Sequence, residues 1–311
     1  MGRYVIKRIL MMIPIILSIT FVVYGLMSLA PGDPGTALLG SSAPEEQIQA
    51  FNHSVGFDRP FIVKYGDFVY NMIFKLDFGI SYRTRQPIIN EIRHRLPISF
   101  QLAFFGTLFA AVIGIPLGVL SAVKQYSLMD TLPTGIAMFL QAVPTFWMGM
   151  MLIYLFAFVL GWLPAYGLES VSSYILPMVT IGLGHAARLL RYTRSSMLET
   201  IRSDYVRTAR AKGAAERAVI WKHALKNGLL PVITILGTTF GLLISGAIVT
   251  ENLFSISGLG TLTLTSINLR DTPTVVATAV VFALIYNIIL MMIDILYAFI
   301  DPRIKAKYSR K

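Results

Sequence analysis

The sequence predicts an all-α membrane protein with six transmembrane helices, and two observations support this. Of the 311 residues, 55% are hydrophobic and only 14% are charged, whereas about 25% of the residues in soluble domains are charged. In addition, six stretches contain no Asp, Glu, Lys or Arg and are long enough, or nearly so, to cross a hydrocarbon core that needs about 20 residues. These stretches are Ile9–Ala30, Ile98–Val123, Leu132–Trp162, Tyr174–Ala187, Gly228–Thr250 and Thr274–Ile293.

The first stretch is predicted to be an uncleaved span that begins in the cytoplasm. Ile9–Ala30 is longer than the roughly 7–15 apolar residues of a signal peptide. Lys and Arg gather before this stretch, in the segment Arg188–Asn227 and in the tail after Pro302, whereas Gly161–Ser173 contains neither. Because Lys and Arg are enriched in cytoplasmic loops, both termini are predicted to be cytoplasmic.

The spans divide the chain into two predicted regions. Residues 1–97 would hold the first span and a large extracytoplasmic loop, and residues 98–311 a five-helix core with a cytoplasmic loop at 188–227. In the outer loop, apolar side chains at helical spacing predict an amphipathic helix that lies on the bilayer or caps the bundle. This helix either has no ligand role or docks an external partner. Its apolar side chains are Tyr65, Phe68, Val69, Met72 and Ile73.

The sequence offers no pattern typical of an enzyme. The absence of cysteine excludes disulfides, thiolate metal sites and a cysteine nucleophile, and neither a phosphate-binding loop nor a zinc-protease or serine-hydrolase motif is present. The net charge of +11 comes from basic residues between the spans, which favours anionic lipid over nucleic acid as a partner.

Three polar side chains within the spans are predicted to form hydrogen bonds between helices. They are Gln101, Gln141 and Asn287. Gln141 also lies close to Pro144, and both are candidates for lining a pore.

The polar segment Arg188–Asn227 contains a predicted helix, turn and helix. Asp204 is suited to cap a helix that runs to Ala211, Gly213 to end it in a left-handed conformation, and Glu216 to begin the next helix. Alanines surround the turn and leave little side-chain bulk, so another protein's groove could approach the backbone closely. The alternative is a basic loop that rests on anionic lipid.

This segment resembles the cytoplasmic coupling loop of ATP-binding cassette (ABC) importer permeases. Their general pattern is Glu-Ala-Ala, three residues, Gly, nine residues, Ile-x-Leu-Pro. Aligned on Gly213, the chain matches it at Ala209, Gly213 and Leu225, while Arg207 and Thr208 replace the first Glu and Ala.

One branch is matched more fully, the B-type subunits of the dipeptide, oligopeptide and nickel permeases. The stretch Asp204–Gly213 resembles that branch, as do other motifs along the chain. These are Leu29–Pro34, Gly56–Pro60, Asp77–Tyr82, Arg95–Pro97, Phe254–Gly260 and Asp294–Arg303. Ser257 departs from the family, which has proline there.

The resemblance implies the architecture of a type I ABC importer in a bacterial or archaeal inner membrane. The chain would pair with a second, C-type permease, two cytoplasmic ATPases and an extracytoplasmic solute-binding protein. ATP and Mg²⁺ would be bound by the ATPases, and this chain would hold no cofactor and no ATPase site. The expected cargo is dipeptides or oligopeptides, with nickel or glutathione-like solutes as alternatives.

The resemblance also implies roles for particular residues. Coupling to the ATPases is assigned to Arg207, Thr208, Ala209, Lys212, Gly213, Ala214, Ala215 and Glu216. The outer gate, on the side of the binding protein, is assigned to Glu251, Phe254, Ser257, Gly258 and Gly260.

Two other classes of protein fit less well. An ion-coupled secondary transporter usually shows internal repeats, and no clear repeat relates the two halves of the sequence. A membrane-embedded hydrolase would need paired catalytic residues.

Overall fold

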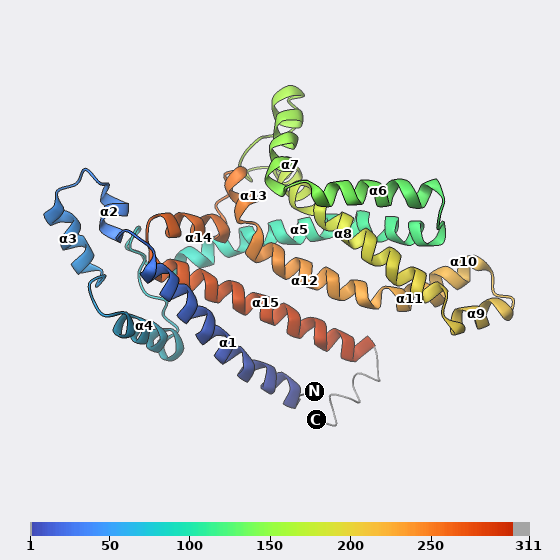
Figure 1. Cartoon of the computed structure of the whole chain (residues 1–311), viewed down its shortest axis with the longest axis horizontal. Coiled ribbons are helices and arrows are strands. Elements are labelled where there is room, and N and C mark those ends of the chain that lie inside the picture. The colour runs from blue at the N-terminus through green and yellow to red at the C-terminus, as the bar shows by residue number, and fades with distance from the viewer. Residues whose placement is uncertain (1, 301–311) are drawn as a thin grey trace. The chain divides into compact units, whose positions relative to one another are not determined.

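The computed structural model describes residues 2–300, and its regular elements there are helices, with a single isolated bridge between Ile80 and Pro87. Figure 1 shows their arrangement within the chain. The end of the motif Asp294–Arg303 and the basic tail lie outside the described residues. The longer helices are α1 (Gly2–Leu29), α3 (Glu45–Ser54), α4 (Phe61–Tyr70), α5 (Ile88–Val123), α6 (Leu128–Ala142), α7 (Thr145–Leu152), α8 (Ile175–Ile201), α9 (Asp204–Ala211), α12 (Leu230–Gly246), α14 (Leu259–Asn268) and α15 (Thr272–Ile300). The shorter ones are α2 (Pro34–Leu39), α10 (Glu216–Ala218), α11 (Leu225–Gly228) and α13 (Ile248–Leu253).

By length and composition, the described part of the chain holds three to five candidate membrane spans. Val5–Leu29, Ile88–Val123 and Thr272–Leu296 each qualify alone. Two bent pairs qualify together: α6 with residues 145–159, at 103°, and residues 216–228 with 230–245, at 49°. The remaining predicted span, Tyr174–Ala187, forms the first half of α8, except for Tyr174, which ends the helical turn before it. The number six and the cytoplasmic termini stay predictions.

The described residues divide into two compact units, and each is considered separately. The first comprises residues 2–99 and 257–291, and the second residues 100–256 and 292–300. Helices α5 and α15 therefore each contribute residues to both units.

In the first unit, the predicted amphipathic helix is α4 and the helical turn that follows it, Asn71–Lys75. Phe68 and Met72 are buried with Tyr24 of α1 and with Val276 and Val280 of α15. The helix therefore packs against other helices, and its placement relative to the bilayer stays a prediction. Its role in docking a partner stays a prediction.

Two of the family-like motifs in this unit form internal hydrogen bonds. Asp33 accepts hydrogen bonds from the backbone N–H of Thr36 at 2.8 Å and from the Asn52 amide at 2.7 Å, and so caps α2. The fully buried Asp271 accepts hydrogen bonds from Ser81 at 2.6 Å and Thr274 at 2.8 Å. A buried carboxylate needs such donors, so these contacts fix the loop before α5 to the start of α15.

In the second unit, α5 and α8 approach each other closely through glycines. A Cβ atom added at Gly118 would lie 2.6 Å from the carbonyl oxygen of Leu190, and one added at Gly114 would clash with the carbonyl oxygen of Ala186. The spacing Gly114-x-x-x-Gly118 is a known means of close packing between membrane helices. It holds α5 directly against α8, the helix that leads into the predicted coupling segment.

Candidate coupling site

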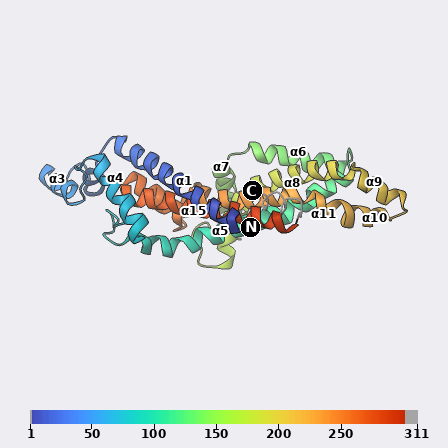
Figure 2. The same cartoon turned by 90° about the horizontal axis from the view of Figure 1, so that it is seen from below.

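The polar segment begins as the last turns of α8 and continues into α9 and α10. Within the second unit, α9 and α10 lie beyond the ends of α6 and α8 in both views of the chain (Figures 1 and 2). Helix α9 ends at Ala211, as predicted, but Asp204 is its first residue and not its cap. The cap position belongs to Ser203, whose extended backbone (φ −69°, ψ 151°) precedes the helix and whose hydroxyl donates to Thr200 at 2.6 Å. The predicted cap was therefore wrong by one residue.

The turn after α9 has the geometry predicted for a glycine-terminated helix. Gly213 has φ +78°, its N–H donates to the carbonyl of Arg210 at 2.9 Å, and the N–H of Ala214 donates to the carbonyl of Ala209 at 3.3 Å. These two bonds define a Schellman motif, which satisfies carbonyls at the helix end. The left-handed end at Gly213 is confirmed, as is the start of a second helix at Glu216.

An ion pair bridges the turn. The guanidinium of Arg210 donates to Glu216 at 2.7 and 3.0 Å. The hydrogen bond with Glu216 raises the pKa of Arg210, so the arginine stays charged. Both side chains are well exposed, at 36% for Arg210 and 60% for Glu216, and the pair therefore shapes the turn while remaining accessible to a partner.

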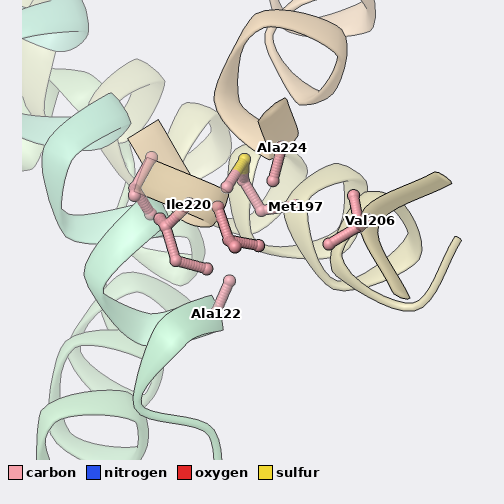
Figure 3. Close-up of a cluster of buried hydrophobic side chains, with 7 residues drawn as sticks. Ala122, Met197, Val206, Ile220 and Ala224 are labelled. Carbon is pink, nitrogen blue, oxygen red and sulfur yellow. The ribbon is translucent and has the colours of Figure 1, made fainter. Parts of the chain in front are cut away.

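Beneath the turn lies a buried apolar cluster that joins it to two long helices (Figure 3). Val206 of α9 and Val219, Ile220 and Ala224 of the helical turn after α10 pack with Met197 of α8 and with Val119 and Ala122 of α5. Val206, Val219, Ala224 and Met197 are fully buried. This coupling cluster attaches the turn to α5 and α8.

The structure brings the predicted coupling residues together around one exposed turn. Arg207, Thr208, Lys212, Gly213, Ala215 and Glu216 are exposed. Ala209 and Ala214 are half-buried and pack against the coupling cluster.

Two exposed aromatic residues of the same segment were not singled out by sequence reasoning. Trp221 is 59% exposed and Tyr205 is 45% exposed, and the Tyr205 hydroxyl accepts a hydrogen bond from Asn227 at 2.9 Å. Exposed Trp and Tyr are typical anchors of protein interfaces. Their presence in an otherwise basic segment is the signal that could have identified them.

The predicted outer-gate residues fall on both sides of the boundary between the two units, and each unit is considered separately. Glu251 and Phe254 are fully buried in the second unit, where the Phe254 carbonyl accepts a hydrogen bond from Gly167 at 2.9 Å. Ser257, Gly258 and Gly260 belong to the first unit, and of these three only Ser257 is exposed. Their gate role stays a prediction.

The predicted pore candidates lie at a sharp bend in the second unit. Gln141 and Pro144, both exposed, flank the 103° break between α6 and α7. Figure 1 shows α7 turning away from α6 at this point. The oxygen of Gln141 accepts a hydrogen bond from Arg191 of α8 at 3.1 Å.

The predicted interhelical hydrogen bonds are confirmed at two of three positions. Gln141 meets Arg191, and Gln101 accepts from Tyr174, on the helical turn before α8, at 2.8 Å. Asn287 is a correction, because its amide donates to the Ala283 carbonyl in its own helix. A side chain four residues further along a helix can reach that carbonyl, and no partner helix is needed.

A comparison with protein families decides the identity. A model described as the binding-protein-dependent transport system inner membrane component matches residues 114–306, and the N-terminal model of the same system matches residues 1–103. The chain is an ABC importer permease of this family. The permease is therefore a multi-pass protein of the inner membrane.

Relatives of the permease extend over its whole length. The dipeptide transport system permease protein DppB of Alkalihalophilus pseudofirmus is 38% identical over 98% of this chain and 100% of its own. The glutathione transport system permease protein GsiC of Escherichia coli K12 is 37% identical over 99% of this chain and 100% of its own. These matches make the permease one of the DppB type.

Solved structures show the same fold at low sequence identity. An inward-facing MetNI methionine ABC transporter matches with a TM-score of 0.56 and 18% identity, over 70% of this chain and 99% of its own. An amino acid ABC transporter crystallised with histidines matches with a TM-score of 0.52 and 12% identity, over 69% and 94%. The expected importer fold is thus supported beyond sequence similarity.

Proposed function

We propose that the permease is the B-type half of a channel that imports short peptides, and that the turn around Gly213 receives the movement of a cytoplasmic ATPase. The cargo follows from the relatives: one is named for dipeptides and the other for glutathione, which is itself a small peptide. Glutathione is therefore the second candidate cargo.

The observation that carries the coupling role is the contrast between an exposed turn and its buried attachment. Small residues and an exposed ion pair form the surface of the turn, while Val206 and Ile220 join it to α5 and α8 through the coupling cluster. A partner that moves the turn therefore moves two long helices with it. Rigid-body motions of this kind are a common basis of alternating access.

The other subunits of the transporter belong to the same proposal. A C-type permease would complete the channel, two ATPases would bind ATP and Mg²⁺, and an extracytoplasmic binding protein would deliver the cargo. This chain would hold neither nucleotide nor an ATPase site. Six spans with cytoplasmic termini, regions at 1–97 and 98–311, a large outer loop and a gate at Glu251–Gly260 complete the proposed topology.

The lack of cysteine makes the coupling role directly testable. In the complete transporter, Ala215→Cys places a single thiol on the exposed turn, and Ser42→Cys places a matched, exposed thiol between α2 and α3. We expect Ala215→Cys to cross-link to an ATPase subunit and to react with an impermeant maleimide only in inside-out vesicles. We expect Ser42→Cys to react only in right-side-out vesicles and to form no such cross-link.

The opposite labelling pattern would refute the proposed orientation, and failure of Ala215→Cys to cross-link would refute the coupling site. Transport supplies the second test. The complex reconstituted with its binding protein should accumulate dipeptides only when ATP is inside with the ATPases. Accumulation that survives the omission of ATP would contradict the proposed mechanism.

A further inference from the structure

A polar cavity lies beside the break between α6 and α7 in the second unit. Its volume is about 420 Å³, and it is lined by Gln141, Arg188, Arg191, Tyr192 and Ser195. That volume is within the range of small-molecule sites, about 300–1,000 Å³. Backbone that departs from a helix at membrane depth is tolerated where it is buried in protein or lines a water-filled cavity, and broken helices commonly form the substrate sites of transporters.

Within the described residues, two guanidinium groups in this cavity have no acidic partner. Arg188, Arg191 and Arg194 recur every three residues along α8. Arg194 forms a bidentate pair with Asp130, whereas neither Arg188 nor Arg191 pairs with a carboxylate of residues 2–300. Arg188 lies over the ring of Tyr192, 5.6 Å from its centre, and Arg191 donates to Gln141.

Such an arrangement suits a carboxylate ligand. The planar fork of an arginine guanidinium binds carboxylates with two parallel hydrogen bonds. The amide of Gln141 and the hydroxyls of Tyr192 and Ser195 offer neutral hydrogen-bonding groups for a peptide backbone.

We propose that this cavity binds the C-terminal carboxylate of a peptide in transit, through Arg188 and Arg191. The proposal rests on the proposed function of peptide import. Every unmodified peptide carries one such carboxylate whatever its side chains are, so a site for this group accepts many sequences. The positive charge of Arg188 and Arg191 disfavours a free metal cation as cargo.

The test is an equilibrium binding measurement on the complete permease–ATPase complex in nanodiscs, without nucleotide. Leaving out the binding protein removes its own selectivity from the measurement. The probes are dialanine with a fluorescent N-terminal label and the same compound with a C-terminal amide. The variants are Arg188→Gln and Arg191→Gln, with Lys124→Gln as the matched control, because Lys124 is exposed and does not line the cavity.

We expect the wild-type complex and Lys124→Gln to bind the free acid at least about tenfold more tightly than the amide, as charge-assisted hydrogen bonds imply. In Arg188→Gln and Arg191→Gln this ratio should fall towards one while binding of the amide is retained.

Three results would overturn the proposal. The first is a wild-type complex without a preference for the acid, an observation that needs no variant to fold. The second is a ratio that both variants leave unchanged. The third is an equal loss of affinity for both probes, as expected if the arginines serve packing or hold a lipid phosphate. ATP-dependent transport and cross-linking at Ala215→Cys would then remain as independent tests of the importer itself.

Discussion

Two arginine–carboxylate pairs in the second unit share one geometry and differ in their surroundings. Arg194 meets Asp130 at 2.5 and 2.8 Å, and Arg210 meets Glu216 at 3.0 and 2.7 Å. The Asp130 side chain is 5% exposed, whereas that of Glu216 is 60% exposed. The buried pair holds α6 against α8, whereas the exposed pair stabilises the turn that is proposed to contact an ATPase. Burial, rather than contact distance, thus separates the fixed parts of the permease from the part proposed to meet an ATPase.

The largest effect is expected from breaking the buried pair. Asp130→Asn leaves Arg194 without its counter-charge between α6 and α8. Removing one partner of a fully buried pair costs about 3–5 kcal/mol, and the lower end is expected here because the Arg194 side chain is 25% exposed. The thermal unfolding midpoint of the purified complex should fall strongly. Asp130→Leu combined with Arg194→Met should recover much of the loss, because no unpaired charge remains. A double variant that is as unstable as the sum of the single ones would contradict this account.

A second comparison concerns apolar neighbours on the same helical turn. Ile220 is 5% exposed in the coupling cluster and Trp221 is 59% exposed on the surface. Ile220→Ala should lower the stability of the complex by about 2–4 kcal/mol through lost burial and a cavity. It should also reduce the transport obtained per ATP hydrolysed, since the turn is then loosely attached to α5 and α8.

Trp221→Ala is the matched control for this effect. It removes more apolar surface but leaves no cavity, so the free energy of unfolding should stay within about 0.5 kcal/mol of wild type. Its effect should instead be a weaker association with the ATPase, measured by the salt at which the subunits separate. Equal destabilisation by both substitutions would show that the burial of Ile220 is not what fixes the turn.

The third prediction concerns the turn itself. Gly213 has φ +78° and no atom within 4 Å of an added Cβ, so the strain of substitution is conformational and not steric. Gly213→Ala should therefore destabilise the turn by about 1 kcal/mol, and Gly213→Asn by less. Gly213→Trp should insert into the membrane normally but uncouple ATP hydrolysis from transport, because its bulk blocks the partner's groove. Normal stimulated transport by Gly213→Trp would remove the coupling assignment.

Local sequence rules predicted the turn well because its geometry depends on neighbouring residues. A left-handed helix end favours glycine, so Gly213 was identifiable without the structure. The cap of α9 was missed because Ser203 and Asp204 are both favourable cap residues and lie next to each other. Backbone dihedrals decide between them, and these depend on how α8 ends.

Features built from residues far apart in the sequence could not be predicted in this way. Asp130 and Arg194 are separated by 64 positions, and no local pattern pairs them. The packing of α4 against α1 and α15 could not be predicted for the same reason. An amphipathic face indicates that one side of a helix is covered, but it does not identify the covering element. The 103° angle between α6 and α7 could not be predicted either, although Pro144 indicated where the helix would end.

The smallest effect is expected from the exposed pair, and this completes the comparison. Glu216→Gln keeps the shape of the side chain and removes its charge, so stability should fall by less than about 1 kcal/mol. Salt should weaken the wild-type interaction, since exposed charges are screened over roughly 8 Å at physiological ionic strength. The difference in stability between wild type and Glu216→Gln should therefore shrink between 50 mM and 500 mM NaCl. The loss of stability in Asp130→Asn should persist over the same range. If salt reduces the stability losses of both variants equally, the two ion pairs lie in similar environments. That result would contradict the distinction between the fixed helices and the accessible turn.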